Sequence, residues 1–316
     1  MAQQTLVKQP QKQPVFSVFM NQDNIKNLVQ RAVGKDAQKF TSAIISAVSN
    51  NPALQKCEQS TILSAALLGQ SLGLSPSPQL GHYYIVPFED KKNNRTVATF
   101  QLGYKGYIQL AMRSGQYIDL DVIEIKEGEY KGKDKKTGKQ IFEFIEDDDL
   151  RENLPTIGYM AYFELLNGFR KTIYWTKQKM LNHADKYSPA FSKNGGEVIH
   201  TRYGDKTKVS YEDFVAGKFD PNDAWLYSSF WYKSFDDMAF KTMLRQLISK
   251  WGIMSIEMQD AFTRDDAVIN ESGEPSYVEY DGADTVTYEA ESTDTSDSTD
   301  PTPEESEEFD FFGSTQ

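Results

Sequence analysis

The side chains best suited to chemistry in this sequence are three polar groups spaced four residues apart. Lys105, Gln109 and Arg113 would form one ridge of a helix between Tyr104 and Ser114, because positions i, i+4 and i+8 share a helical face. Two cations and an amide on one ridge can hold successive phosphates of a nucleic acid without reading its bases. An amphipathic helix with a solvated edge has the same pattern, so the spacing alone leaves both interpretations open.

A predicted β-hairpin leads into this helix. Residues 81–88 and 96–102 are rich in aromatic and β-branched residues, and the polar stretch between them contains two asparagines that tolerate turn geometry. Gly103 breaks the second strand, and the apolar period then changes from two to 3.6. Tyr104 and Tyr107 lie on the apolar face of the helix, so we expect them to support the core rather than to stack on bases.

These motifs resemble the RecT (lambda beta-type) family of phage single-strand annealing recombinases. Leu-Ser-Pro at residues 74–76 precedes GHYYIVPF, and ATFQLGYKGYIQLAMRSG follows the turn. In that family a hairpin leads into a helix with a GY-K/R/Q-G pattern that ends in a basic residue followed by Ser-Gly. Met112 stands where many members carry a second arginine, so a pair of cations is not expected there. The resemblance is sharpest over residues 54–115, continues more loosely to about Trp251 and leaves out the acidic end of the chain.

The resemblance implies an α+β fold in which N-terminal helices precede β-hairpins that pack with helices and form a basic DNA groove. It implies an ATP-independent protein of homologous recombination, without catalytic site, cofactor or metal, that binds single-stranded DNA and pairs complementary strands through an annealed duplex intermediate. It also implies a homo-oligomeric ring or helical filament and a phage exonuclease as partner. A phage or prophage product of this kind is expected in the bacterial cytoplasm and away from membranes. The matched motif makes Lys105, Gln109 and Arg113 the first candidates for DNA contacts.

Six further cations are secondary candidates for phosphate contacts. They are Lys179, Lys186, Arg202, Lys206, Lys241 and Arg245. The first two share one stripe of a helix predicted after Thr176. The next two lie in residues 188–223, interpreted as a long, partly ordered loop in which rings alternate with cations, either to stack on bases or to pack on the core. The last two lie one turn apart on a helix predicted over residues 234–250, away from its apolar face.

The charge divides the chain unevenly. Residues 260–316 hold 18 acidic residues and one basic residue, whereas residues 1–259 carry a net charge of +5. We therefore expect a flexible arm over residues 1–19, a core for annealing, DNA binding and oligomerisation over residues 20–259, and a disordered acidic tail over residues 260–316. The tail ends in EEFDFFGSTQ, which is either a docking peptide, for instance for a host single-strand-binding protein, or a chance sequence.

Other chemistry fits the sequence less well. The glycines of GKDKKTGK at residues 132–139 are too far apart for a P-loop, and Gln140 replaces the required Ser or Thr, so we interpret this stretch as a hairpin tip. Cys57 is the only cysteine, the three histidines have no metal-ligand spacing, and no apolar run is long enough for a membrane span. Two alternative functions stay open, an oligomeric adaptor and a metal-dependent nuclease. The carboxylates available to such a nuclease are Asp119, Asp121, Asp236 and Asp237.

Overall fold

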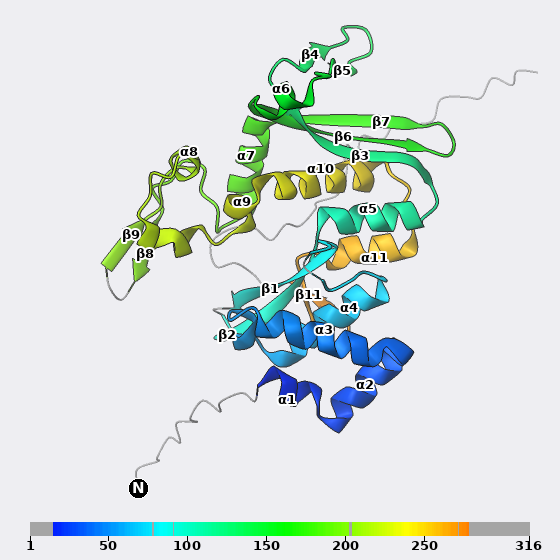
Figure 1. Cartoon of the computed structure of the whole chain (residues 1–316), viewed down its shortest axis with the longest axis vertical. Coiled ribbons are helices and arrows are strands. Elements are labelled where there is room, and N and C mark those ends of the chain that lie inside the picture. The colour runs from blue at the N-terminus through cyan, green and yellow to red at the C-terminus, as the bar shows by residue number, and fades with distance from the viewer. Residues whose placement is uncertain (1–14, 78, 91, 202–203, 271, 278–316) are drawn as a thin grey trace, which may run out of the picture. The chain divides into compact units, whose positions relative to one another are not determined.

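The computed structural model describes residues 15–277 except for residues 78, 91, 202–203 and 271. These residues fold into α-helices and antiparallel β-strands, which confirms the predicted α+β class (Figure 1). No helix within these ranges is both long and apolar enough to cross a lipid bilayer. Most of the expected N-terminal arm and the greater part of the expected acidic tail lie outside the described residues.

Four helices at the N-terminus pack around a second hydrophobic core, to which Ala98 also contributes. They are α1 Phe16–Met20, α2 Asp23–Val33, α3 Ala37–Ser49 and α4 Gln59–Ser71, joined by the short 3₁₀ helices η1 Gly34–Asp36 and η2 Leu54–Lys56. Phe40 and Ile44 of α3 belong to this core, as their helical spacing predicts. Phe16 and Met20 of α1 are also buried in it, so the packed fold begins inside the segment expected as an arm, residues 1–19.

The predicted hairpin and helix are both present and confirmed. They are β1 Tyr83–Asp90, β2 Arg95–Leu102 and α5 Tyr104–Arg113. The two strands pair antiparallel from Tyr83 opposite Leu102 to Asp90 opposite Arg95, and Asn94 adopts a left-handed conformation in the turn, with φ of 48°. Asp90 closes the turn by accepting a hydrogen bond from Arg95 Nε at 3.0 Å.

A second antiparallel sheet has the strand order β3-β6-β7, and the long helix α10 packs on it (Figure 1). The bounds are β3 Tyr117–Lys126, β6 Thr156–Leu165, β7 Arg170–Thr176, α7 Lys177–Tyr187 and α10 Phe235–Trp251. A turn at Asn167-Gly168, a dipeptide that favours tight turns between strands, joins β6 to β7. Thr176 caps α7 by accepting a hydrogen bond from the backbone N of Lys179 at 3.1 Å. The main hydrophobic core lies around this sheet and includes Tyr159, Phe163 and Leu244.

A separate small hairpin occupies the stretch whose glycine spacing approaches that of a P-loop. Its strands are β4 Tyr130–Lys133 and β5 Gln140–Phe142, and the short helix α6 Asp148–Glu152 comes after it. A strand therefore follows the glycine-rich tip at the place where a P-loop requires a helix. The interpretation of this stretch as a hairpin tip is confirmed.

The region expected as a loop, residues 188–223, contains several short elements. They are β8 Val198–Thr201, β9 Gly204–Thr207, α8 Tyr211–Val215 and the 3₁₀ helix η3 Pro221–Tyr227, with α9 Phe230–Lys233 just beyond. Its aromatic rings pack on one another and on the core: the ring centroids of Phe191 and Tyr232 are 4.8 Å apart, and those of Tyr211 and Phe235 are 5.1 Å apart. Of the two roles considered for these rings, packing is the one that their contacts support.

The packed fold also continues beyond residue 259. Helix α11 Ile256–Arg264 crosses the boundary expected between core and tail, and the strands β10 Val268–Ile269 and β11 Pro275–Ser276 follow it. The backbone N of Phe100 in β2 donates a hydrogen bond to the carbonyl oxygen of Ala267 at 2.9 Å. The high acidic content of residues 260–316 conceals this contribution, because the apolar residues that pack here are few and widely spaced.

Candidate nucleic-acid interface

Two glycines fix α5 against the β1–β2 hairpin. A β-carbon at Gly103 would lie 2.2 Å from the carbonyl oxygen of Gly81, and one at Gly106 would lie 2.1 Å from the carbonyl oxygen of His82. Any side chain at either position would collide with the backbone of the hairpin. The Gly-Tyr-Lys-Gly sequence therefore lets the start of the helix touch the hairpin, while Lys105 between the two glycines is exposed.

The three residues of the predicted ridge do follow one another along α5. Lys105 and Arg113 are exposed and Gln109 is half-buried. Arg113 also donates hydrogen bonds to the backbone carbonyl oxygens of Leu72 and Gly73, just after α4, and these bonds hold its guanidinium in place beside α5. Burial lowers the pKa of His82, and the positive charges of Arg113 and Lys105 lower it further. Both cations therefore act on the same part of the surface.

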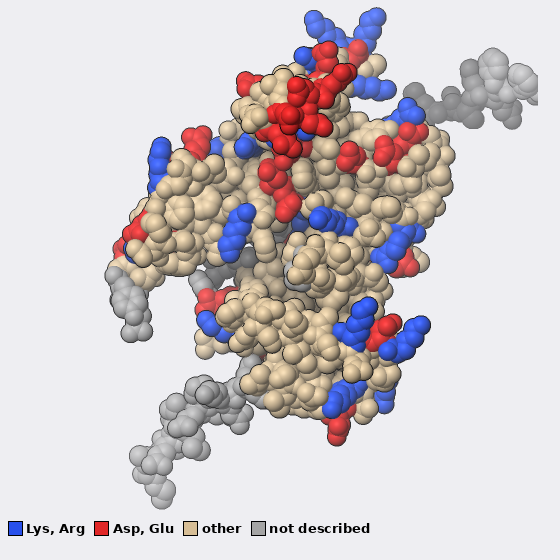
Figure 2. Space-filling model, viewed as in Figure 1, with Lys and Arg blue, Asp and Glu red and all other residues tan. Residues whose placement is uncertain are grey.

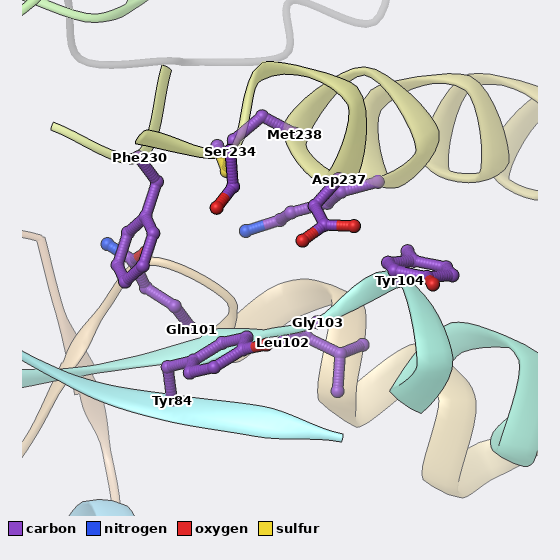
Figure 3. Close-up of a pocket in the computed structure, with 10 residues that line it drawn as sticks. Tyr84, Gln101, Leu102, Gly103, Tyr104, Phe230, Ser234, Asp237 and Met238 are labelled. Carbon is purple, nitrogen blue, oxygen red and sulfur yellow. The ribbon is translucent and has the colours of Figure 1, made fainter. Parts of the chain in front are cut away.

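A small pocket lies between the β1–β2 hairpin and the start of α10 (Figure 3). Its volume is about 50 Å³ and its walls include the rings of Tyr84, Tyr104 and Phe230. The centroids of the Tyr84 and Phe230 rings are 5.6 Å apart. The Asp237 carboxylate projects into the pocket from α10, where burial raises its pKa and the charge of nearby Lys105 opposes that rise. Ring faces beside an exposed cation are the combination on which nucleobases stack.

Lys241 and Arg245 lie in a buried ion-pair network and not on an exposed ridge. Lys241 Nζ is 3.1 Å from Asp265 Oδ1 and Arg245 Nη1 is 2.7 Å from Asp265 Oδ2, and the Asp265 side chain is fully buried. Tyr107 Oη and the backbone N of Leu102 donate to the same carboxylate at 2.8 and 2.7 Å. Burial alone would raise the pKa of Asp265, but the two cations bring it below its ordinary value.

This network gives the two cations a packing role, because it joins α10 to α5 and β2 through one carboxylate. We therefore leave Lys241 and Arg245 out of the proposed DNA surface. Local sequence contains no signal for the network, since Asp265 stands 24 residues after Lys241 in a stretch whose composition predicts a tail.

Helix α7 presents the second basic stripe that the sequence predicts. Lys179 and Lys186 are exposed and flank His183, whose pKa is lowered to about 4 by burial and by these two charges. Lys179 Nζ lies 4.0 Å from the ring centroid of Trp175, and Lys186 Nζ lies 4.8 Å from that of Tyr187. The structure thus brings both cations next to aromatic rings.

The remaining predicted contacts are less well placed. Lys206 is half-buried and its Nζ lies 2.8 Å from Asp223 Oδ1, so its charge is matched within the protein. Arg202 lies outside the described residues. The structure buries Tyr107 fully, as expected, whereas Tyr104 is half-buried at the wall of the pocket.

Sequence reasoning missed the pocket. Tyr84 had a usable signal, because neighbouring side chains of a strand point to opposite faces and its neighbour in the aromatic run is a core residue. Phe230 and Asp237 had none, since they reach the hairpin only through the packing of α9 and α10.

The carboxylates considered for a nuclease divide between β3, which carries Asp119 and Asp121, and the start of α10. Within the part of the chain that the structure describes, no three His, Cys, Asp or Glu side chains form a group that could hold a metal ion.

An α+β fold that presents exposed cations beside aromatic rings has the features of a protein whose cations contact the phosphates of a nucleic acid and whose rings stack on its bases. Residues 38–279, well over half of the chain, match the model of the RecT family, and the chain therefore belongs to the RecT family. At the level of the family, this makes it a recombination and single-strand annealing protein. The matched region extends past the boundary expected at residue 259 and includes Asp265.

Two similar proteins support the assignment. The chain is 38% identical over 237 residues to the uncharacterized protein YqaK of Bacillus subtilis strain 168, an alignment that covers 75% of this chain and 67% of YqaK. It is 26% identical over 258 residues to Protein RecT of Escherichia coli strain K12, covering 78% of this chain and 79% of that protein. The resemblance inferred from the hairpin and the Gly-Tyr-Lys-Gly helix is thereby confirmed.

Proposed function

We propose that this protein binds single-stranded DNA without sequence preference and anneals complementary strands without hydrolysing a nucleotide, in support of homologous recombination. The observation that carries the proposal is the ridge of Lys105, Gln109 and Arg113 on α5, beside a pocket with aromatic walls, in a chain of the RecT family. Lys179 and Lys186 extend the proposed DNA surface along α7.

The chemistry of these groups is suited to annealing. Lysine and arginine hold phosphates by charge, so they grip any sequence and leave the base edges free to pair. Aromatic faces add contacts that tolerate every base. The free energy of the reaction comes from base pairing between the strands, so no catalytic group and no ATP is required of the protein.

We further propose that the protein acts as a homo-oligomeric ring or helical filament on a strand that a phage exonuclease supplies. One protomer offers few cations, and the affinity of a charged surface for a polyanion grows with the number of phosphates it neutralises. Protomers placed side by side would hold a long strand extended, which lets a second strand test its complementarity along the whole length.

Annealing of two complementary oligonucleotides, one carrying a fluorophore and the other a quencher, tests the proposal directly. The purified protein is added to one strand in buffer without nucleotide, and the second strand follows. Quenching several-fold faster than the spontaneous rate is expected, and a rate equal to the spontaneous one refutes the proposal. An adaptor would leave bare DNA unbound even at low salt, and a nuclease would shorten the labelled strand on a denaturing gel when magnesium or manganese is present.

A further inference from the structure

The β4–β5 hairpin is a second concentration of positive charge, separate in the sequence from the cations of α5 and α7. Residues 130–142, called here the basic finger, contain five lysines and one acidic residue. Four of the lysines are exposed without a salt bridge to any described residue: Lys133, Lys135, Lys136 and Lys139. Lysine side chains project from this hairpin in Figure 2, while acidic side chains gather over the neighbouring α6.

The tip of the basic finger is an ordered turn. Its single carboxylate, Asp134, accepts hydrogen bonds from the backbone N of Thr137 at 2.6 Å, from Thr137 Oγ1 at 2.8 Å and from the backbone N of Lys136 at 3.0 Å. These bonds lower the pKa of Asp134. The carboxylate thus stabilises the turn that displays the lysines.

The base of the basic finger is held firmly as well. Glu129 is fully buried and accepts hydrogen bonds from Arg151 Nε at 2.6 Å and from the backbone N of Lys126 at 2.7 Å. Above it, the ring of Tyr130 stacks on Tyr174 of β7 with 4.6 Å between centroids. The hairpin that carries the lysines is therefore anchored to β7 at its base, unlike a flexible loop.

Neighbouring side chains connect the basic finger to the proposed DNA surface. Burial lowers the pKa of Lys179 on α7, and the charge of Lys133 lowers it further, so the two ammonium groups share one region of positive potential. His183 lies between Lys179 and Lys186 on the same helix, and its ring centroid is 6.4 Å from that of Trp231. The residue before Trp231 in the chain, Phe230, forms a wall of the pocket beside α5.

We propose that the basic finger binds the phosphodiester backbone of the same DNA strand that α5 and α7 hold, and so lengthens the segment that each protomer covers. This inference rests on the proposed function. Residues 143–152 hold six acidic residues and one arginine, so they repel phosphates from the base of the finger and confine DNA contact to the tip and the side facing α7.

A triple variant with Lys133→Gln, Lys135→Gln and Lys136→Gln tests this contact. Affinity for a labelled oligo(dT) is measured as a function of salt concentration. Loss of three phosphate contacts reduces the magnitude of the negative slope of log K against log salt by roughly 2, because each contact with a single strand contributes about 0.7. The matched control replaces Lys26, Lys35 and Lys39 of the N-terminal helices by glutamine, which removes equal charge at exposed positions.

The outcomes separate the proposal from its alternatives. A lower slope for the finger variant alone supports it, while equal slopes for the finger variant and the control overturn it and indicate an effect of net charge. An unchanged slope together with a smaller sedimenting species also overturns it, because the finger would then contact a second copy of the chain. If the unaltered protein itself fails to bind oligo(dT), the proposed function fails instead. Equal melting temperatures confirm that the variants fold.

Discussion

The substitution Asp265→Asn tests whether one carboxylate holds the centre of the fold together. Asparagine keeps the size of the side chain but removes the buried charge that lies 3.1 Å from Lys241 and 2.7 Å from Arg245. Among the described residues, Lys241 then keeps the more exposed carboxylate of Asp266, at 3.3 Å, as its ion-pair partner. Removing one partner of a buried ion pair costs roughly 3–5 kcal/mol. A domain has only about 5–15 kcal/mol of stability in total, so the variant should be close to unfolding at room temperature.

Urea unfolding followed by tryptophan fluorescence at pH 7 measures the change in the free energy of unfolding. The matched control is Asp260→Asn on α11, where the carboxylate lies 2.7 Å from Arg264 and is 37% exposed. A partly exposed i,i+4 pair contributes about 0.5 kcal/mol or less, so the control should unfold almost as the unaltered protein does. If the two variants differ by less than about 1 kcal/mol, the reasoning about the buried network is wrong.

The pH dependence provides a second readout of the same network. The pKa of Asp265 lies below its ordinary value in the folded protein, so its contribution to stability is present above the ordinary carboxyl pKa of about 4 and is lost as the pH falls through the lower folded value. The stability gap between the unaltered protein and Asp265→Asn should therefore narrow in acid. Adding Lys241→Met to Asp265→Asn should recover part of the loss at pH 7, because it removes a buried cation that has lost its buried partner, while the other carboxylate near Lys241, Asp266, is 55% exposed.

Three further predictions concern other parts of the chain. Lys105→Gln should lower the salt slope of oligo(dT) binding by roughly 0.7, whereas Lys56→Gln, exposed in the N-terminal block, should leave the slope unchanged; equal slopes for both variants would remove α5 from the DNA surface. A chain ending at residue 277 should melt cooperatively like the full chain, but one ending at residue 259 loses Asp265 and should show no cooperative transition by circular dichroism. The pKa of His183 is lowered to about 4 by burial, so stability should fall as the pH drops from about 6.5 to about 4, by up to about 3 kcal/mol; His183→Asn should flatten that part of the pH profile, and an unchanged profile would contradict it.

The elements of this fold that could be predicted are those with strong local patterns. The β1–β2 hairpin and α5 follow from alternating strands, a turn and a change of apolar period at Gly103. The turn at Asn167-Gly168 and the cap at Thr176 are short-range signals of the same kind. Such signals depend on residues within a few positions of one another, so a single sequence is enough to read them.

The features that could not be predicted depend on contacts between distant parts of the chain. Residues near Lys241 in the sequence do not show whether its ammonium group pairs with a buried carboxylate or contacts a phosphate. In either case the lysine would lie beside the apolar stripe of α10, so the local pattern is the same. The acidic composition likewise predicts a tail beyond residue 259, where a few apolar residues and one buried aspartate complete the core. Composition gives the net charge of a segment, whereas its burial depends on contacts with residues distant in the sequence.

The network around Asp265 also has a consequence for how the chain reaches its native state. The carboxylate bonds to Leu102 and Tyr107, which lie 163 and 158 residues earlier in the chain. Contacts of such long sequence separation slow folding, because the loop between them must close before they form. During synthesis on the ribosome, both cations of α10 emerge before their counter-charge does. The Asp265 network that joins the hairpin, α5 and α10 therefore cannot form until residue 265 has been synthesised, 158 residues after Tyr107.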